Sequence, residues 1–288
     1  MGRWPVDRSA GGPLMLDGVW YPAPAARPPA PAVLLLHGCG GLLGRQGQPT
    51  SRIRDYAARL NAQGWHVLAL DSLTARGETE LCTQRIGTRR VTQVQRRRDA
   101  LGALQWLAAQ PDVDPTRLAL LGWSHGGSAA LAAHNLNQPE VARATVRARL
   151  AVAFYPGCEA EARRGYRPAG NTWLLLGLAD DWTPPEPCQR LAQAGPPWVR
   201  VQAWAGAVHG FDSPAPVRHR ADVPNGARPG AGVSVGGHPQ ARAESWALLR
   251  QALQEAFDPS DTTGPAPAVT AWRRPGSVGD ADAAGGSP

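Results

Sequence analysis

The sequence predicts an α/β fold with a mostly parallel central sheet and helices on both faces. Short apolar runs alternate along the chain with longer segments of helical periodicity. Most of the short runs are apolar almost throughout, as expected of strands that are covered on both faces. A helix between consecutive strands is the usual connection in a parallel sheet. We therefore expect one domain, covering residues 1–257.

The expected elements follow one another in a regular order. A short strand near LMLDGVWY precedes a proline-rich, extended connection. Further strands are expected at residues 32–37, 65–70, 117–122, 150–155, 172–177 and 198–204. Helices are expected at residues 51–63, 95–109, 126–137, 185–193 and 239–257. Residues 258–288 lose this periodicity, which predicts a disordered tail.

The composition limits the possible partners of the chain. Its formal charge is +7 and all 30 of its basic residues are arginine, but only Arg89, Arg90 and residues 96–98 cluster. These arginines adjoin a helical pattern, and we interpret them as a solvated helix face rather than a phosphate-binding patch, so no nucleic-acid partner is expected. No segment reads as a membrane span or a secretory signal, which favours a cytoplasmic protein.

The four cysteines predict neither a metal site nor a redox motif. Cys39, Cys82, Cys158 and Cys188 have no C-x-x-C spacing. Free thiols are the expected state, and a bridge between Cys158 and Cys188 is the alternative that an exported protein would raise.

Two serines match the pattern G-x-S-x-G, which marks the nucleophile of many hydrolases. Ser124 lies in GWSHGG and Ser234 in GVSVGG. In an α/β-hydrolase the nucleophile occupies a sharp turn between a strand and a helix, with small flanking residues. Ser124 follows a predicted strand and precedes the helical run SAALAAHNL, whereas Ser234 lies in a glycine- and proline-rich segment that reads as a loop. The sequence therefore favours Ser124.

A serine nucleophile needs a histidine that takes its proton and a carboxylate that orients the histidine. In α/β-hydrolases the acid and then the histidine follow the serine, each in a loop after a later strand. Asp180 and His209 fit this order, since they follow the strands at 172–177 and 198–204. Asp181 is the alternative acid. The other downstream histidines are less suitable, because His134 lies on a helix and His219 and His238 lie in an irregular insertion.

Two backbone amides are expected to bind the oxyanion. One is that of His125, directly after the nucleophile. The other is assigned to Cys39 in HGCGG, which follows the strand at 32–37. Nothing in the sequence pairs the Cys39 thiol with a base, so a packed thiol is expected there rather than a nucleophile.

Five ordered motifs, HGCGG, DSLTARG, GWSHGG, GLADDWTP and GAVHGF, resemble the dienelactone hydrolase family of α/β-hydrolases over about residues 14–257. The resemblance implies an α/β-hydrolase fold, Asp180 as the acid and His209 as the base. The founding enzymes of the family have cysteine at the position of Ser124 and glutamate at that of His37, so the chain is more similar to the serine esterase branch. Arg76 corresponds to an arginine that helps to bind the substrate carboxylate in the founding enzymes.

These observations lead to a functional prediction. Ser124, Asp180 and His209 are expected to cleave a small-molecule carboxylic ester or lactone through an acyl-enzyme, with no metal or organic cofactor. Trp123 and Trp182 are candidates for an apolar substrate pocket, although core packing accounts for them equally well. Amide cleavage on the same fold is one alternative, and a non-catalytic binding module on a hydrolase scaffold is another.

Overall fold

A central sheet of eight strands organises the part of the chain that the computed structural model describes, residues 2–7 and 14–258. The strand order is β1-β2-β4-β3-β5-β6-β7-β8. The pairs β1–β2 and β2–β4 are antiparallel, and every pair from β4 to β8 is parallel. The strands are β1 (Gly2–Asp7), β2 (Leu14–Tyr21), β3 (Ala30–Leu36), β4 (His66–Leu70), β5 (Val113–Trp123), β6 (Leu150–Phe154), β7 (Asn171–Gly177) and β8 (Val199–Trp204). The predicted α/β fold with a mostly parallel sheet is confirmed.

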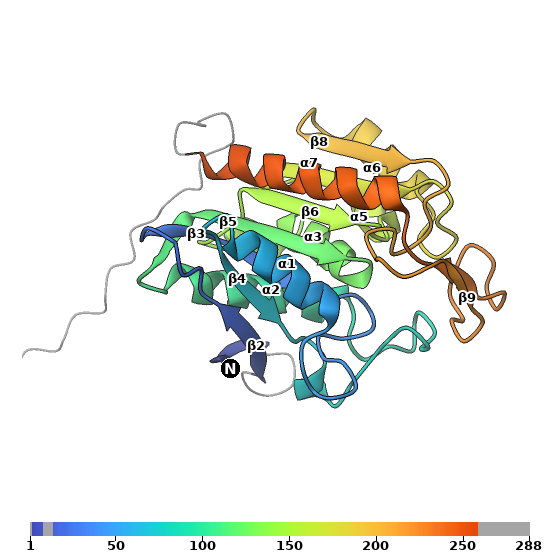
Figure 1. Ribbon diagram of the computed structural model, residues 1–288, viewed down its shortest axis with the longest axis horizontal. Coiled ribbons are helices and arrows are strands. Elements are labelled where there is room, and N and C mark those ends of the chain that lie inside the picture. Colours follow the sequence, from blue (N-terminus) through green and yellow to red (C-terminus); the bar gives the residue numbers. More distant parts are fainter. Residues whose placement is uncertain (1, 8–13, 259–288) are drawn as a thin grey trace, which may run out of the picture.

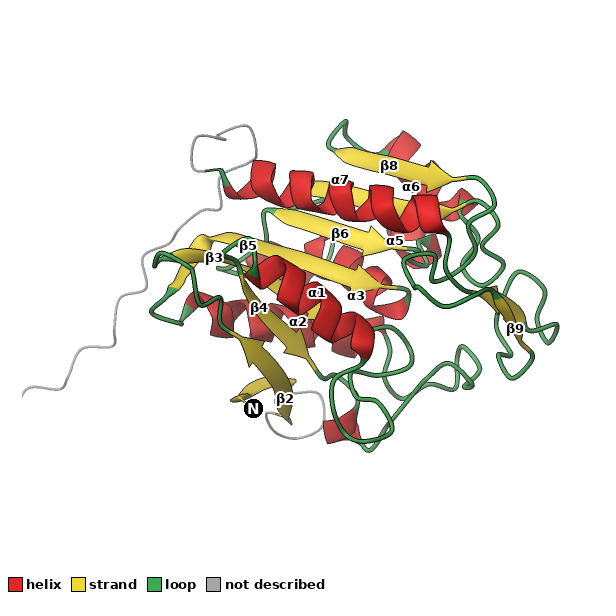
Figure 2. Ribbon diagram, in the orientation of Figure 1, coloured by secondary structure: helices red, strands yellow, loops and turns green. Residues whose placement is uncertain are grey.

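Helices cover both faces of this sheet (Figures 1 and 2). The apolar residues of α1 and α7 pack on one face, and those of α2 and α3 pack on the other. The helices are α1 (Ser51–Asn61), α2 (Gln93–Ala108), α3 (His125–His134), α4 (Pro139–Arg143), α5 (Glu159–Arg164), α6 (Glu186–Ala194) and α7 (Pro239–Phe257), with a short 3-10 helix, η1, at Thr74–Arg76. The short helices α4 and α5 were not expected, because five or six residues give too little periodicity to detect.

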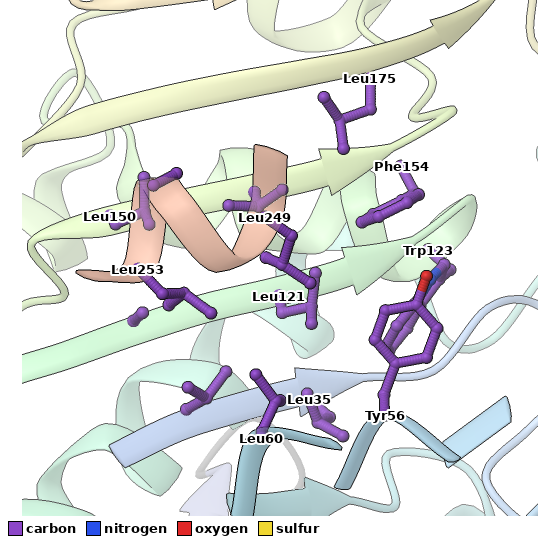
Figure 3. Close-up of a cluster of buried hydrophobic side chains, with 14 of the residues drawn as sticks. Leu35, Tyr56, Leu60, Leu121, Trp123, Leu150, Phe154, Leu175, Leu249 and Leu253 are labelled. Carbon is purple, nitrogen blue, oxygen red and sulfur yellow. The ribbon is translucent and has the colours of Figure 1, made fainter. Parts of the chain in front are cut away.

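The larger core cluster lies between the sheet and the helices α1 and α7 (Figure 3). Leu35, Leu121 and Leu175 come from three different strands and are fully buried. Leu249 and Leu253 lie one turn apart on α7 and cover them. The cluster continues to Trp123, Phe154 and Tyr56 at the carboxyl ends of the strands, where aromatic rings replace aliphatic side chains. The core therefore extends to the edge of the sheet at which ligands bind in open α/β folds.

An insertion between β8 and α7 projects beyond this edge of the sheet (Figure 1). It contains the two-stranded hairpin β9 (Arg218–Arg220) and β10 (Val233–Val235), which pair antiparallel. Ser234 therefore lies on a short strand rather than in the expected loop. The sequence did not predict this strand, because Ser234 has neighbouring glycines and glycine is uncommon within strands. The predicted tail at residues 258–288 lies outside the described residues, apart from Asp258.

The expectation of free thiols is wrong. Cys39 is bonded to Cys82, and Cys158 is bonded to Cys188. The partners are separated by 43 and 30 residues in the sequence. Cys39 and Cys82 lie in two loops, whereas Cys158 precedes α5 and Cys188 lies on α6; spacing in the sequence does not reveal that these segments meet.

The interpretation of residues 96–98 as a solvated helix face is also wrong. Arg96 is fully buried on the sheet side of α2, and Arg97 is nearly so. Arg97 and Arg98 both bind Glu140 of α4, with Nη2–Oε2 and Nε–Oε1 distances of 2.7 Å. Helix α4 thus covers arginines that would otherwise face water.

Candidate active site

Ser124 occupies the sharp turn between β5 and α3. Its backbone has φ 53° and ψ −120°, a region that is costly for any residue other than glycine. The amide of Ser124 donates to the carbonyl of Phe154 at 2.9 Å, which fixes the turn to the neighbouring strand β6. A strained residue at the carboxyl end of a sheet is typical of a nucleophile held toward a ligand site.

Two glycines allow this turn to form. A Cβ atom on Gly122 would lie 2.2 Å from the carbonyl oxygen of Gly126, and one on Gly126 would lie 2.0 Å from the carbonyl oxygen of Leu36. Both separations are far below van der Waals contact, so only glycine permits α3 to approach β3 and β5 this closely. The glycines of the motif therefore have a steric role that the sequence pattern predicted.

Asp180 and His209 are brought together by the loops after β7 and β8. His209 Nδ1 lies 2.8 Å from Asp180 Oδ2, and both side chains are almost completely buried. The amides of Trp182 and Thr183 each donate to Asp180 Oδ1 at 2.9 Å. These contacts hold the carboxylate in one orientation, and the carboxylate in turn holds the imidazole ring in one orientation.

The hydroxyl of Thr183 completes this arrangement. It lies 3.0 Å from Tyr155 O, 3.0 Å from Asp180 Oδ2 and 3.1 Å from His209 Nδ1. Asp180 Oδ2 can only accept, so its 2.8 Å contact with Nδ1 requires the ring proton there, and the Thr183 hydroxyl then donates to Tyr155 O or Asp180 Oδ2. The proton of the neutral His209 ring is thereby held on Nδ1, which leaves Nε2 as the basic nitrogen.

The alternative acid, Asp181, and the alternative serine, Ser234, bind each other instead. The amide of Ser234 donates to Asp181 Oδ1 at 2.7 Å, and its hydroxyl donates to Asp181 Oδ2 at 3.0 Å. His238 caps α7 by accepting from the amide of Ala241. The second G-x-S-x-G match therefore has a structural use in joining the insertion to the loop that carries Asp180.

Ser124 and His209 line one cavity of about 240 Å³. Cys39, Trp123 and Trp182 also line it, as does Cys82. The Trp182 ring lies 4.6 Å from the His209 ring between centroids. Trp123 is 99% covered and packs against Phe154, so only its edge reaches the cavity. A neighbouring cavity of about 490 Å³ shares Gly38, Arg52 and Trp123 with the first and extends along the start of α1.

Arg76 is not brought to this cavity. Its guanidinium binds the buried Asp99 of α2 through both nitrogens, with Nη1–Oδ2 and Nη2–Oδ1 distances of 2.8 and 2.7 Å. Nη1 also donates to the carbonyl of Ser72 at 2.7 Å. The structure therefore gives Arg76 an internal ion pair and does not support contact with a substrate carboxylate.

A buried polar network beside His209 was not expected from the sequence. Asp212 accepts from Arg52 Nε at 3.0 Å, from the hydroxyl of Tyr56 at 3.1 Å and from that of Tyr155 at 2.7 Å. The Tyr155 ring in turn lies 4.5 Å from the His209 ring. Burial raises the pKa of Tyr155 well above its usual value, so this hydroxyl stays a donor. The D in GAVHGFD was the signal that could have pointed to Asp212.

A second network lies beneath the proposed oxyanion site. The fully buried Arg96 donates through Nη1 to the carbonyl of His37 at 2.8 Å and lies 3.2 Å from His125 Nδ1. Burial, followed by the charge of Arg96, lowers the pKa of His37 to about 3 and that of His125 well below its usual value. Both rings are therefore neutral at pH 7, and neither lines the cavity of Ser124.

The described residues also bear on ion and membrane binding. Within residues 2–7 and 14–258, no group of three or more His, Cys, Asp or Glu side chains is arranged to hold a metal ion. In the same part of the chain, no helix combines the length and apolarity needed to cross a membrane.

A mostly parallel sheet with a strained serine after one strand, and with an acid and a histidine after later strands, defines an α/β-hydrolase. The model of the dienelactone hydrolase family matches residues 16–257, so the chain belongs to this family of hydrolases, as the sequence motifs predicted. No match was found among curated protein sequences.

Solved structures of three hydrolases resemble the chain. A dienelactone hydrolase-like promiscuous phosphotriesterase, P91, from metagenomic libraries is 21% identical, with a TM-score of 0.65 over 89% of this chain and 98% of the other. An esterase, Est2, of Thermogutta terrifontis is 20% identical, with a TM-score of 0.56 over 90% and 94%. A puromycin-hydrolysing peptidase of Mycobacterium tuberculosis is 24% identical, with a TM-score of 0.52 over 73% and 36%. At these identities the likeness concerns the fold.

Proposed function

We propose that the protein hydrolyses a carboxylic ester or lactone through an acyl-enzyme on Ser124. His209 Nε2 takes the proton of the Ser124 hydroxyl as its oxygen attacks the carbonyl, and then gives that proton to the leaving alcohol. Water, activated by His209 in the same way, then attacks the acyl-enzyme, which releases the acid and frees Ser124. Asp180 holds the imidazole in place and stabilises the positive charge that forms on it.

One observation carries this proposal: a histidine whose Nδ1 is bound to a buried carboxylate lines the same cavity as a strained serine. The oxyanion that forms during attack needs donors that already point at it. The amide of His125 is suited to this role, since it opens α3 and the first amides of a helix have no partner within the helix. The amide of Cys39 is the proposed second donor, because Cys39 lines the same cavity as Ser124.

The two serines provide a matched test. Ser124→Ala is expected to lower kcat for an activated ester on the order of 10⁶-fold, and Asp180→Asn on the order of 10⁴-fold. Ser234→Ala is the control, since the same pattern surrounds a serine that binds Asp181, and its kcat should stay within a few-fold of wild type. Loss of activity in Ser234→Ala with retention in Ser124→Ala would refute the assignment.

Cleavage of an amide is the second candidate, because one solved structure of this fold is a puromycin-hydrolysing peptidase. Turnover of matched ester and anilide substrates separates the two activities. A non-catalytic binding module is the alternative outside the enzymes. A fluorophosphonate probe distinguishes it, because it labels Ser124 only if that hydroxyl is activated, and a module without activity would give neither label nor turnover.

The charge of the cavity favours a substrate that carries a negative group. Its charged lining residues are Arg52, Arg218 and Arg220, and no acidic residue of the described chain lines it. Arg52 and Arg220 are paired with Asp212 and Asp222, so Arg218 is the lining arginine on which the expectation rests. We expect Arg218→Ala to raise KM for esters that carry a carboxylate more than it raises KM for neutral esters of the same size. Arg228→Ala is the matched control, because Arg228 belongs to the same insertion but does not line the cavity. Equal effects of both variants would contradict the expectation.

The two disulfides bear on the compartment in which the protein works. Disulfides persist in oxidising compartments and are rare in the cytoplasm, which the sequence alone favoured. We therefore propose that the protein works in an oxidising compartment. Thiol titration of protein isolated from its native cells under denaturing, alkylating conditions tests this, with no reactive thiol expected from residues 39, 82, 158 and 188 and four if the protein is kept reduced.

A further inference from the structure

We propose that Cys82 is a positioning residue for the hydrolysis, and that its bond to Cys39 holds the Cys39 amide in place as an oxyanion donor. This inference rests on the proposed function, since it concerns a donor to the oxyanion of ester cleavage. It goes beyond that proposal by assigning a role in the reaction to a residue 42 positions before the nucleophile.

The segment that carries the Cys39 amide is intrinsically loose. It follows the end of β3 and contains Gly38, Gly40 and Gly41 around the single cysteine. Glycine has more backbone freedom than any other residue, so such a turn does not fix the direction of an amide by itself. A donor that stabilises a transition state must be held in place before the reaction, because reorientation during the reaction costs free energy.

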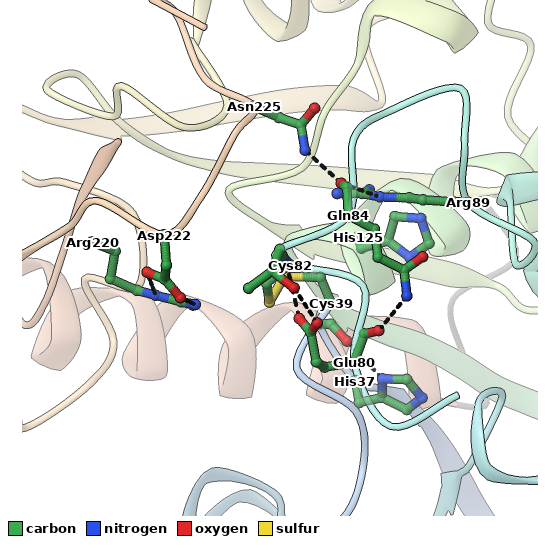
Figure 4. Close-up of a disulfide and its surroundings, with 12 residues drawn as sticks. His37, Cys39, Glu80, Cys82, Gln84, Arg89, His125, Arg220, Asp222 and Asn225 are labelled. Atoms are coloured by element: carbon green, nitrogen blue, oxygen red, sulfur yellow. Dashed lines mark hydrogen bonds and ion pairs between the residues drawn. A yellow bond between two sulfur atoms is a disulfide. The ribbon is translucent and has the colours of Figure 1, made fainter. Parts of the chain in front are cut away.

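Contacts with residues 79–82 supply this rigidity (Figure 4). Besides the disulfide, the amide of Leu81 donates to the carbonyl of Cys39 at 2.7 Å. Gly41 has φ +83°, and a Cβ atom there would lie 2.6 Å from the carbonyl oxygen of Thr79, so the two backbones touch. The disulfide is the covalent contact in this set, and it is attached to Cys39, whose amide is the proposed oxyanion donor.

The segment that carries Cys82, residues 78–86, is itself held by several hydrogen bonds. The amide of Thr83 donates to Glu80 Oε2 at 3.0 Å, and Gln84 Nε2 donates to Glu78 Oε2 at 2.9 Å. Asn225 of the insertion donates through Nδ2 to the carbonyl of Gln84 at 2.8 Å (Figure 4). It also accepts from the amide of Ile86 at 2.9 Å. A disulfide to a segment that is fixed in this way can transmit rigidity to the oxyanion turn.

The second disulfide provides a matched control. Cys158–Cys188 joins α5 to α6 among the apolar residues between these helices, and neither cysteine lines the cavity of Ser124. The test compares Cys39→Ser/Cys82→Ser with Cys158→Ser/Cys188→Ser. The first variant keeps the backbone amide of residue 39 and leaves no free thiol at the site, so the bond is the main change.

We expect Cys39→Ser/Cys82→Ser to lower kcat about 10- to 100-fold with KM changed less than about 3-fold, since complete loss of one oxyanion donor costs about 10²- to 10³-fold. Binding of a boronic acid, whose adduct with serine mimics the tetrahedral intermediate, should weaken by a similar factor. The control variant should lose thermal stability but keep kcat within about 2-fold. A purely structural role would lower Tm in both variants and leave kcat and boronic acid binding unchanged.

A reduction experiment covers the case in which Cys39→Ser/Cys82→Ser does not fold. Folded Cys158→Ser/Cys188→Ser protein is treated with a water-soluble phosphine, which takes the oxygen of water to become the phosphine oxide while the disulfide gains two electrons and two protons. Mild urea is added until two thiols per chain titrate, and kcat is followed against the thiols released. A kcat that is independent of the thiol count would overturn the inference alone. Absence of ester turnover in the wild type would overturn the proposed function and, with it, this inference.

Discussion

Removal of the Asp212 carboxylate tests whether the polar network beside His209 supports both the fold and the reaction. In Asp212→Ala, the hydroxyls of Tyr56 and Tyr155 lose a charged acceptor within a buried site. Hydrogen bonds to charged groups contribute about 1.5–3 kcal/mol each. The Arg52 contact adds less, about 1 kcal/mol, because its side chain is 35% exposed and can be solvated.

The carboxylate itself no longer has to be desolvated in the variant, which offsets part of this loss. The expected decrease in the free energy of unfolding is therefore about 3–5 kcal/mol, the range found when one member of a buried charged pair is removed. Since Tyr155 packs on the His209 ring, kcat should fall as well. Urea denaturation at constant pH measures the first effect, and turnover of an ester well below the transition measures the second.

Asp222→Ala is the matched control for this prediction. Asp222 also binds an arginine, Arg220, but its side chain is 55% exposed. An exposed pair contributes little, so no measurable change in the urea midpoint is expected. If Asp212→Ala were no less stable than Asp222→Ala, the reasoning from burial would be refuted.

Three further predictions concern the turn, pH and Arg76. Gly126→Ala should lower Tm and kcat together, because a Cβ 2.0 Å from the Leu36 carbonyl must push α3 away from β3; an unchanged Tm in a thermal melt would contradict this. Burial lowers the pKa of His134 to about 4, below the unfolded value of about 6.5, so the unfolded chain binds the proton first and stability falls as pH drops from about 6.5 to 4, by about 3 kcal/mol. His134→Leu should flatten that slope in urea titrations at several pH values. Arg76→Ala leaves Asp99 buried without this partner and should cost about 3–5 kcal/mol in urea, while preference for carboxylate-bearing esters stays unchanged.

Much of the fold follows from local patterns in the sequence. The runs at 32–37, 150–155 and 172–177 became β3, β6 and β7 within two residues, and the last helix was predicted at its observed bounds, Pro239–Phe257. Each of these elements buries its apolar residues in a regular pattern, so the periodicity of the sequence predicts it well. The turn at Ser124 was also predicted, because the glycines that it requires are adjacent in the sequence.

The features that the sequence did not predict depend on contacts between distant residues. Arg96 reads as a surface residue until α2 is placed against the His37 carbonyl. The bond between Cys39 and Cys82 depends on a loop packing across the end of β3. Asp212 has an ordinary sequence context, and its importance comes from Tyr56, which lies 156 residues away. Local patterns cannot encode such partners, since the sheet decides which loops meet.

The hairpin of the insertion limits which residues near the cavity can be changed independently of one another. Its strand β10 is joined to the loops that carry the proposed acid and base, because Ser234 binds Asp181 beside Asp180 and the amide of Gly236 donates to the carbonyl of His209 at 3.0 Å. Insertions or deletions at residues 233–236, which would break these backbone contacts, are therefore expected to alter rate and selectivity together, unlike loss of the Ser234 hydroxyl alone. Arg218 on the other strand of the hairpin, β9, lines the cavity but makes neither of these two contacts, so it is a position at which selectivity is expected to change with less effect on rate.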